Sequence, residues 1–286
     1  MGITHSPLRY PGGKSVLSAL LGSFIETNNL LDGIYVEAYA GGAGAALKLL
    51  FSEFVSQIVL NDADESVYLF WYAIVNHTED FLKLIGDTPV TIEEWRRQRY
   101  IFGNPSCFDL VQVGFSTFFL NRCNRSGILY AGPIGGQSQS GDWRLDVRFN
   151  KISLIKRIER IALYKSRISI YNEDALLFLE KHVKVLSEEN AKILVYVDPP
   201  YYSKGSQLYL NYYSHDDHVA LSTYIINQND YKWILSYDDV PEIRKLYDGL
   251  IRTVFSLNYS VYKARAGKEM IIYCPDSNIP NREIIH

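Results

Sequence analysis

The chain has 286 residues, of which 47% are hydrophobic and 21% are charged, and this balance excludes a disordered or fibrous protein. Its length allows one large domain, or a core that carries an insert. The formal net charge is −3, but the segment from Glu93 to Ile170 holds thirteen Lys/Arg and six Asp/Glu, a net charge of +7. A basic segment in an acidic chain favours a phosphate-rich partner, although a chance cluster on a solvated helix is an alternative.

Other features of the composition argue against a membrane protein and a metal protein. No run of 18 or more apolar residues occurs, so we expect no membrane span. The N-terminal sequence MGITHSPLRYPGGK has no apolar signal core, which favours a cytoplasmic protein. The cysteines Cys107, Cys123 and Cys274 form no CxxC motif, so we expect reduced, packed thiols and neither a disulfide frame nor a zinc site.

Strand and helix patterns alternate in the first third of the chain. A helical pattern begins at Ser15 and is followed by the apolar strand GIYVEAY, the helix GAGAALKLLF, the strand SQIVLND and the helix ADESVYLFWYAIV. Such alternation predicts a parallel sheet that is covered by helices on both faces.

The middle of the chain, from about Thr91 to Asn150, has a different pattern. Two helical runs, IEEWRRQRYIF and FDLVQVGFSTFFLNRC, precede the Gly/Ser-rich stretch SGILYAGPIGGQSQSGDW. The glycines from Gly127 to Gly141 preclude a continuous helix there, so we expect a hairpin or a mobile loop.

Alternation resumes in the last third with RISIYNEDALLFLEKHV, the strand KILVYVDPPYY, the helix HDDHVALSTYIINQ, and the strands KWILSY, LIRTVF and EMIIYC. We therefore predict an α/β fold with a Rossmann-like, mostly parallel sheet, in which the late strands rejoin the early ones. Residues 1–87 and 166–286 would form the catalytic core, and residues 88–165 a mainly helical insert. His215 and His218 in SHDDH indicate a polar helix start rather than a metal site.

A glycine-rich loop follows the first predicted strand. In VEAYAGGAGAAL, Gly41, Gly42 and Gly44 separate this strand from the next helix, and glycines let a backbone turn tightly and approach a ligand. Ligands of open α/β sheets bind beyond the carboxyl ends of the strands. The loop lacks the GxGxxG pattern, so a plain strand–helix turn is the alternative.

Asp62 ends the second predicted strand. A carboxylate at this place can accept both ribose hydroxyls of a nucleoside, whereas Asp64 is a candidate N-cap of the next helix. Together with the glycine loop, Asp62 favours an adenosine-containing cofactor.

The segment LVYVDPPYY ends a buried strand with two prolines, which hold the preceding residues extended. The Asp198 carboxylate and the Pro199 carbonyl can then accept the two hydrogens of an amino group on an aromatic ring, while Tyr201 stacks on that ring. A structural turn is the alternative.

In LRYPGGK, Lys14 precedes a helix and could meet a carboxylate over the sheet edge, or belong only to a loop and helix cap.

The motifs PGGK, EAYAGGAG, ND and DPPY follow one another in the order found in the Dam-type (D12 class) DNA adenine methyltransferases, which the chain resembles over about residues 8–275. The resemblance implies S-adenosylmethionine as cofactor, duplex DNA as partner, base flipping, and methyl transfer to the N6 of adenine, with no metal. It implies a catalytic role for Asp198, Pro199, Pro200 and Tyr201. It places the following residues at the cofactor: Tyr10, Lys14, Glu37, Ala40, Gly41, Gly42, Gly44, Asp62, Asp174 and Asp198.

The chain departs from the family in two places. Tyr10 and Pro11 stand where members commonly carry Trp-Ala, and NRCNRSGILYAG replaces the family's NR…FNGLYR, with Asn121 and Arg122 retained. These differences leave the recognised DNA sequence open. Candidate contacts to phosphate or guanine are Arg122, Arg125, Arg144 and Arg148, and candidates for an adenine edge are Asn121 and Asn124. Tyr130 or Trp143 could fill the vacated base stack; each of these residues could instead be an ordinary surface or loop residue.

Two other functions compete with this interpretation. An RNA or protein-glutamine methyltransferase uses a similar tetrapeptide, but the leading lysine motif and the gap of about 150 residues between glycine loop and DPPY favour DNA. A DNA-binding module that lost catalysis is disfavoured by the intact Asp198 and Tyr201. A partner restriction endonuclease is compatible with the sequence and not required by it.

Overall fold

The computed structural model describes residues 4–9, 17–189, 192–202, 213–259 and 265–280. The chain forms two compact units. One, which we call the helical unit, comprises residues 1–13 and 64–170; the other, the sheet unit, comprises residues 14–63 and 171–286. The range 88–165 that we predict for DNA recognition lies inside the helical unit, and its role stays a prediction.

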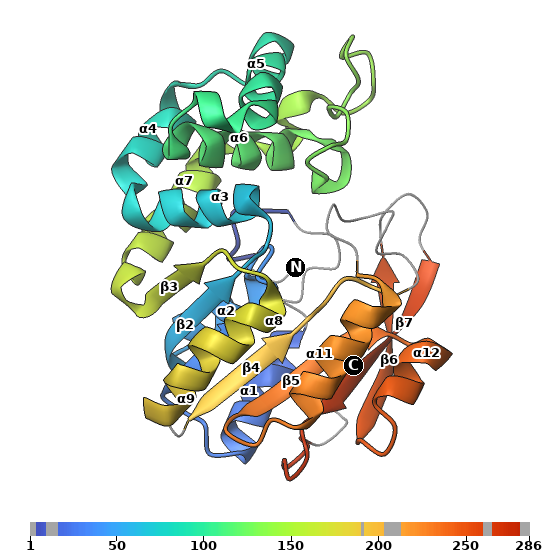
Figure 1. Ribbon diagram of the computed structural model, residues 1–286. Helices are drawn as coiled ribbons and strands as arrows, with labels where there is room; N and C mark the ends of the chain where they lie inside the picture. The colour runs from blue at the N-terminus through green and yellow to red at the C-terminus, as the bar shows by residue number, and fades with distance from the viewer. Residues whose placement is uncertain (1–3, 10–16, 190–191, 203–212, 260–264, 281–286) are drawn as a thin grey trace. The chain divides into compact units, whose positions relative to one another are not determined.

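A seven-stranded sheet has the strand order β3-β2-β1-β4-β5-β7-β6 (Figure 1). The strands are β1 Gly33–Glu37, β2 Val55–Asn61, β3 Ile168–Tyr171, β4 Ile193–Val197, β5 Lys232–Asp238, β6 Arg252–Tyr259 and β7 Arg265–Tyr273. β1 pairs in parallel with β2 and β4, and β4 with β5, whereas β7 is antiparallel to β5 and β6. The late strands rejoin the early ones, which confirms the predicted α/β fold.

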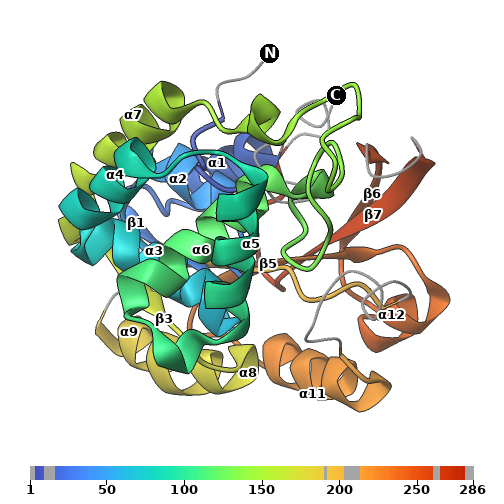
Figure 2. The same cartoon turned by 90° about the horizontal axis from the view of Figure 1, so that it is seen from above.

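The helices of the sheet unit cover both faces of the sheet. They are α1 Ser18–Thr27, α2 Gly44–Phe51, α8 Ala175–Phe178, the π-helix Leu179–Val183, α9 Lys184–Glu189, α11 His215–Ile226 and α12 Pro241–Leu246. α1 and α2 lie on one face, and α8, α9 and α11 on the other (Figures 1 and 2). Every residue of β1 and β4 is buried, as expected for apolar strands that lie between two helical layers.

The helical unit consists of α3 Glu65–Asn76, α4 Thr78–Asp87, α5 Ile92–Gly103, α6 Leu110–Cys123 and α7 Lys151–Ala162, with short 3₁₀ turns between them. α6 packs against α3 and α5 (Figure 2). A Cβ on Gly114 of α6 would lie 2.6 Å from the carbonyl oxygen of Leu69 in α3, so this glycine lets the two helices approach closely. The core of the unit is aromatic and contains Phe70, Phe81, Phe115, Phe118, Phe119 and Phe149.

Two helices begin at side-chain caps that the sequence indicates. Asp64 caps α3 by accepting the N–H of Ser66 at 2.9 Å, and Ser214 with Asp217 forms a capping box that opens α11, so SHDDH is a helix start.

The Gly/Ser-rich stretch contains turns and a single bridge between Asn124 and Pro133 rather than a regular hairpin in its described residues. Within the described ranges, no helix combines the length and apolar character that a membrane crossing requires.

The three cysteines are free thiols. Cys123 and Cys274 are buried as expected, but Cys107 is exposed because it lies in the short 3₁₀ turn that follows α5. The expectation of a packed thiol is therefore wrong for Cys107.

Candidate active site

Four acidic residues lie where parallel strands of the sheet unit end. Glu37 ends β1, Asp62 follows β2, Asp198 follows β4, and Asp238 ends β5. The carboxyl ends of parallel strands meet at one edge of the sheet, and this edge is where open α/β sheets bind ligands. The structure thus brings together the strand ends that carry the sequence motifs.

The glycine loop between β1 and α2 is fastened to the end of β2. The N–H of Gly41 donates to Asp62 Oδ2 at 2.8 Å, and the N–H of Ala40 donates to the Asn61 carbonyl at 2.8 Å. Gly41 and Ala43 both have a φ of 45°, the left-handed region in which a residue with a side chain is strained. Gly42 completes the turn and Gly44 begins α2. Asp62, predicted to hold a ribose, therefore also fixes the loop that would approach the cofactor.

Glu37 ends β1, and its side chain is buried against the start of α2, with 4% of the residue's surface exposed. Its Oε1 accepts the N–H of Ala46 at 3.0 Å and the hydroxyl of Tyr35 at 3.2 Å. Burial raises the pKa of Glu37 to about 8, the charge of Asp198 acts in the same direction, and the two hydrogen bonds oppose the rise. Glu37 consequently carries a proton for most of the time at neutral pH.

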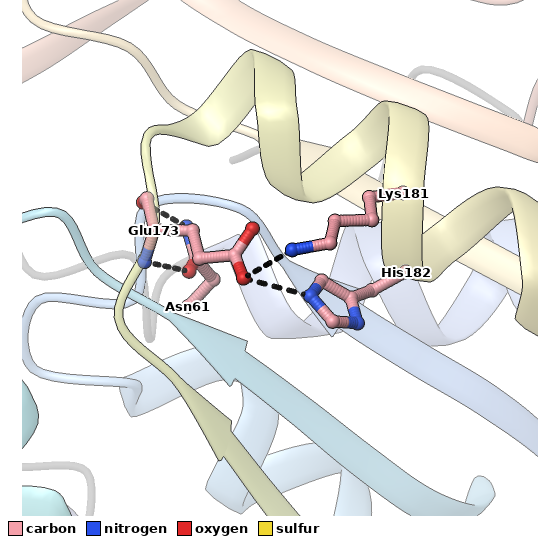
Figure 3. Close-up of polar contacts among 4 residues, drawn as sticks. All are labelled: Asn61, Glu173, Lys181 and His182. Atoms are coloured by element: carbon pink, nitrogen blue, oxygen red, sulfur yellow. Dashed lines mark hydrogen bonds and ion pairs between the residues drawn. The ribbon is translucent and has the colours of Figure 1, made fainter.

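The turn between β3 and α8 is clamped by the side chain of Asn61, which is fully buried (Figure 3). Asn61 Nδ2 donates to the carbonyls of Glu173 and Ala38 at 3.0 Å each, and Asn61 Oδ1 accepts the N–H of Glu173 at 3.0 Å. The Glu173 carboxylate in turn lies 2.9 Å from His182 Nε2 and 3.4 Å from Lys181 Nζ, and these contacts lower its pKa. Asn61 was not predicted as a site residue from the sequence, although an amide at the end of a strand is a signal for such a clamp.

Asp174, predicted to lie near the cofactor's adenine, is the N-cap of α8. Its Oδ1 accepts the N–H groups of Leu176 at 3.0 Å and Leu177 at 3.3 Å, and the side chain is exposed. In the same turn, Asn172 Nδ2 donates to the Asp62 carbonyl at 2.7 Å, which ties Asp174's turn to the end of β2. A contact with adenine stays a prediction.

Asp198 is held by a chain of hydroxyl groups from neighbouring strands. Ser236 Oγ on β5 donates to Asp198 Oδ1 at 2.5 Å, and Tyr196 Oη lies 2.8 Å from Ser236 Oγ. A serine hydroxyl has one hydrogen, so Ser236 donates to the carboxylate and Tyr196 donates to Ser236. Ser236 was not predicted from the sequence, in which its only signal is a hydroxyl residue in the apolar strand KWILSY.

The segment after the prolines is also held by carboxylates. The hydroxyl of Tyr201 donates to Glu269 Oε1, and the N–H of Tyr202 donates to Asp238 Oδ1 at 2.9 Å. Glu269 is buried in β7, with 1% of its surface exposed. Pro199 is buried and Pro200 is half-buried. Glu269 was not expected from the sequence.

An aromatic cluster connects the region of the glycine loop with that of the tetrapeptide. Tyr39 Oη lies 2.6 Å from Tyr213 Oη, and the Tyr213 ring centroid lies 5.4 Å from that of His218. His218 is buried, and its ring centroid lies 5.1 Å from that of Tyr202. Its Nδ1 lies 2.7 Å from Tyr237 Oη. Burial lowers the pKa of His218, which disfavours its charged form beside these rings. Tyr10 and Lys14, both predicted at the cofactor, lie outside the described residues.

In the helical unit, Asn121 and Asn124 are buried and use their amides internally. Asn121 Oδ1 accepts the N–H of Arg9 at 2.7 Å, and its Nδ2 donates to the carbonyls of Arg9 and Gly127 at 2.8 and 2.9 Å. Asn124 Oδ1 accepts the indole N–H of Trp95 at 2.7 Å, and its Nδ2 donates to two carbonyls of the following loop. Their predicted contact with an adenine edge remains untested, and in this structure the amides order the loop.

Arg122 likewise contacts the backbone of its own unit. Its Nε donates to the Arg148 carbonyl at 2.7 Å, and its Nη1 lies 3.5 Å from the Pro7 carbonyl. Burial, followed by the charges of Arg9 and Arg157, lowers the pKa of Arg122 to about 9. The other predicted DNA contacts of the insert have exposed side chains, namely Arg125, Arg144, Arg148, Tyr130 and Trp143.

A family model described as D12 class N6 adenine-specific DNA methyltransferase matches residues 10–264. No curated protein gives a significant sequence match. Among solved structures, the chain is similar to an uncharacterized protein from Listeria monocytogenes serotype 4b, at 6% identity, with coverage of 93% of this chain and 71% of that chain and a TM-score of 0.35. It is also similar to the rRNA methyltransferase aviRa from Streptomyces viridochromogenes, at 12% identity, with 93% and 86% coverage and a TM-score of 0.38.

Proposed function

Because this chain belongs to the D12 class N6 adenine-specific DNA methyltransferase family, we propose that it transfers a methyl group from S-adenosylmethionine to the N6 of adenine in duplex DNA. The observation that carries the proposal is the family match over residues 10–264, which contains the glycine loop, Asp62 and the DPPY tetrapeptide. These features lie at the carboxyl ends of neighbouring parallel strands, where a cofactor and an acceptor base can meet.

The residues at this edge fit an adenosine cofactor that ends in an amino acid. Asp62 would accept the ribose hydroxyls while it holds Gly41, and the glycine loop, with Ala40, Gly42, Gly44 and the buried Glu37, would line the methionine end. Asp174 would lie near the adenine, where it already caps α8. When bound, S-adenosylmethionine supplies a methyl group on a positively charged sulfur.

The tetrapeptide would prepare the acceptor nitrogen. The Asp198 carboxylate and the Pro199 carbonyl would accept the two hydrogens of the adenine amino group, which favours a tetrahedral nitrogen and frees its lone pair to displace the sulfur from the methyl carbon. The nitrogen would then release one of these two hydrogens as a proton. Ser236 fixes the Asp198 carboxylate through Oδ1, so the acceptor is oriented before the base arrives. In-line positioning of this kind can supply most of the rate enhancement.

A base inside a duplex hides its amino group, so the target adenine must be flipped out of the helix, at a cost of a few kcal/mol for unstacking. Tyr201 would stack on the flipped ring. The segment from Glu93 to Ile170, with its net charge of +7, would hold the DNA backbone.

Transfer of isotope from labelled S-adenosylmethionine to duplex DNA, RNA and protein tests this function. We expect label in duplex DNA, recovered as N6-methyladenine, and none with Asp198→Ala, whose position at a strand end should leave the fold intact. Asp216→Ala, which changes an exposed aspartate on α11, is the matched control and should retain transfer. Label in RNA or in protein glutamine instead of DNA would replace the proposal with one of the alternatives, and methyl on cytosine would show that the base is wrong.

A further inference from the structure

The hydrogen bond between Tyr201 and Glu269 joins the tetrapeptide to a strand that carries none of the sequence motifs. Glu269 lies on β7, 68 residues further along the chain. Across the antiparallel β5–β7 pair it stands opposite Asp238, the residue that accepts the N–H of Tyr202. Two adjacent strands therefore hold two successive residues of the segment that follows Asp198, each through a carboxylate.

The burial of Glu269 makes this contact informative. Its neighbours Met270 and Ile271 on β7 are fully buried, and Glu269 itself is 1% exposed. A carboxylate in such a place is costly unless hydrogen-bond donors satisfy it, so an apolar residue would serve the fold of this strand better. The Tyr201 hydroxyl is one donor that satisfies this buried carboxylate.

We propose that Glu269 is a positioning residue that fixes the Tyr201 ring in the orientation in which it stacks on the flipped base. This inference rests on the proposed function, since it assigns the stacking partner of that same reaction. Glu269 would act through Tyr201, without touching base or cofactor.

The geometry of a phenol explains how one bond can orient the ring. The hydroxyl lies at the far tip of the side chain, so an anchored oxygen fixes the direction of the side chain. The O–H bond prefers the ring plane, so the place of the acceptor also biases the rotation of the ring about its long axis. A hydrogen bond in a buried site of low dielectric is strong enough to hold both angles.

A double-mutant cycle tests the coupling. We expect Tyr201→Phe and Glu269→Ala each to lower the single-turnover rate of methyl transfer about 10- to 100-fold, the scale of a misplaced reacting group. The double variant Tyr201→Phe/Glu269→Ala should be no slower than the slower single variant, because both changes break the same bond. Glu269→Gln retains an oxygen acceptor and should restore most of the rate that Glu269→Ala loses.

Tyr231→Phe is the matched control. It removes a phenolic hydroxyl that bonds to Tyr224 next to the start of β5, at the opposite end of this strand from Asp238. We expect it to leave the single-turnover rate unchanged. The proposal would be overturned if the rate loss of the double variant equalled the product of the two single losses. A Glu269→Ala variant that is well folded and as fast as wild type would overturn it too.

A readout without DNA separates this proposal from the proposed function. In protein labelled with ¹³C at the tyrosine Cζ, the Tyr201 resonance is identified by its loss in Tyr201→Phe. It should move in Glu269→Ala and stay in place in Tyr231→Phe, whichever substrate the enzyme methylates. A Tyr201 resonance that is indifferent to Glu269→Ala would refute the contact even if DNA is methylated, and wild-type protein that methylates no DNA would refute the function even if the resonance moves.

Discussion

Glu37 has an acidic side chain whose charge is suppressed by its position. Its carboxyl lies buried between the first turn of α2 and the Tyr35 hydroxyl, and its pKa is about 8, compared with the ordinary value of 4.5. Between these two pH values the folded protein binds a proton more readily than the unfolded chain does. A protonated Glu37 also reduces the negative charge that gathers with Asp198 and Asp62 at the ends of the parallel strands.

The first prediction concerns this proton. The contribution of Glu37 to stability is fully present below about pH 4.5 and is lost as the pH rises through about 8. Glu37→Gln keeps the shape and both hydrogen-bond donors but cannot ionise. Urea unfolding at pH 5 and pH 9 should therefore show that wild type loses free energy of unfolding relative to Glu37→Gln as the pH rises. A difference that is the same at both pH values would contradict the shifted pKa.

The second prediction concerns Asp62, which serves the glycine loop and, as we propose, the ribose. Asp62→Ala should weaken S-adenosylmethionine binding by about 1.5–3 kcal/mol, the scale of a lost charged hydrogen bond. Asp62→Asn is the control, because its amide oxygen can still accept the N–H of Gly41. Calorimetry that gives wild-type affinity for a folded Asp62→Ala variant would refute the ribose assignment.

At the scale of an element, the short helix α8 depends on its cap. It spans four residues, Ala175–Phe178, and its first N–H groups bond to Asp174. The turn before it is held by Asn61 and, through Asn172, by the end of β2. The helix and the edge of the sheet are therefore ordered together, and any ligand contact of Asp174 comes from a side chain that already has a structural role.

The third prediction separates these two roles of Asp174. Asp174→Ala removes the cap and should lower the free energy of unfolding by about 1 kcal/mol, whereas Asp174→Asn caps a helix equally well and should not. If the carboxylate also contacts the cofactor's adenine, Asp174→Asn should weaken S-adenosylmethionine binding at unchanged stability. Thermal unfolding and calorimetry on the same two variants provide both quantities. Wild-type affinity in Asp174→Asn would leave the residue with its capping role alone.

At the scale of the whole molecule, charge is distributed unevenly along the chain. The segment from Glu93 to Ile170 has a net charge of +7, although the complete chain has −3, and its arginines Arg125, Arg144 and Arg148 are exposed. Clustered basic side chains bind phosphates and release counterions when they do so. The helical unit, which contains this segment, is the part of the protein that we expect to grip duplex DNA.

The fourth prediction follows from counterion release. Affinity for duplex DNA should fall steeply with salt, and the slope of log K against log salt should shrink by about one in Arg144→Ala if this arginine contacts a phosphate. Lys184→Ala, which removes an exposed cation from α9 of the sheet unit, should leave the slope unchanged. Binding that is insensitive to salt would show that the basic segment does not hold DNA.

Much of the fold was predictable from the sequence alone. The apolar runs GIYVE and ILVYV predicted buried parallel strands, and both form strands in which every residue is buried. This worked because hydrophobic period and turn residues are local properties. The same is true of Asp62 and Asp198, since a carboxylate directly after an apolar strand marks a strand end without knowledge of its neighbours.

The tertiary structure alone decided which side chains support these motifs and which partners the predicted site residues bond to within the protein. Asn61 bonds to Glu173, Ser236 to Asp198 and Glu269 to Tyr201, and the partners are 112, 38 and 68 residues apart. Asn121, for which a contact with an adenine edge stays a prediction, bonds to Arg9, also 112 residues away. The physical reason is that a polar side chain takes the partner that packing places within about 3 Å, and no local pattern encodes a partner so distant in the chain.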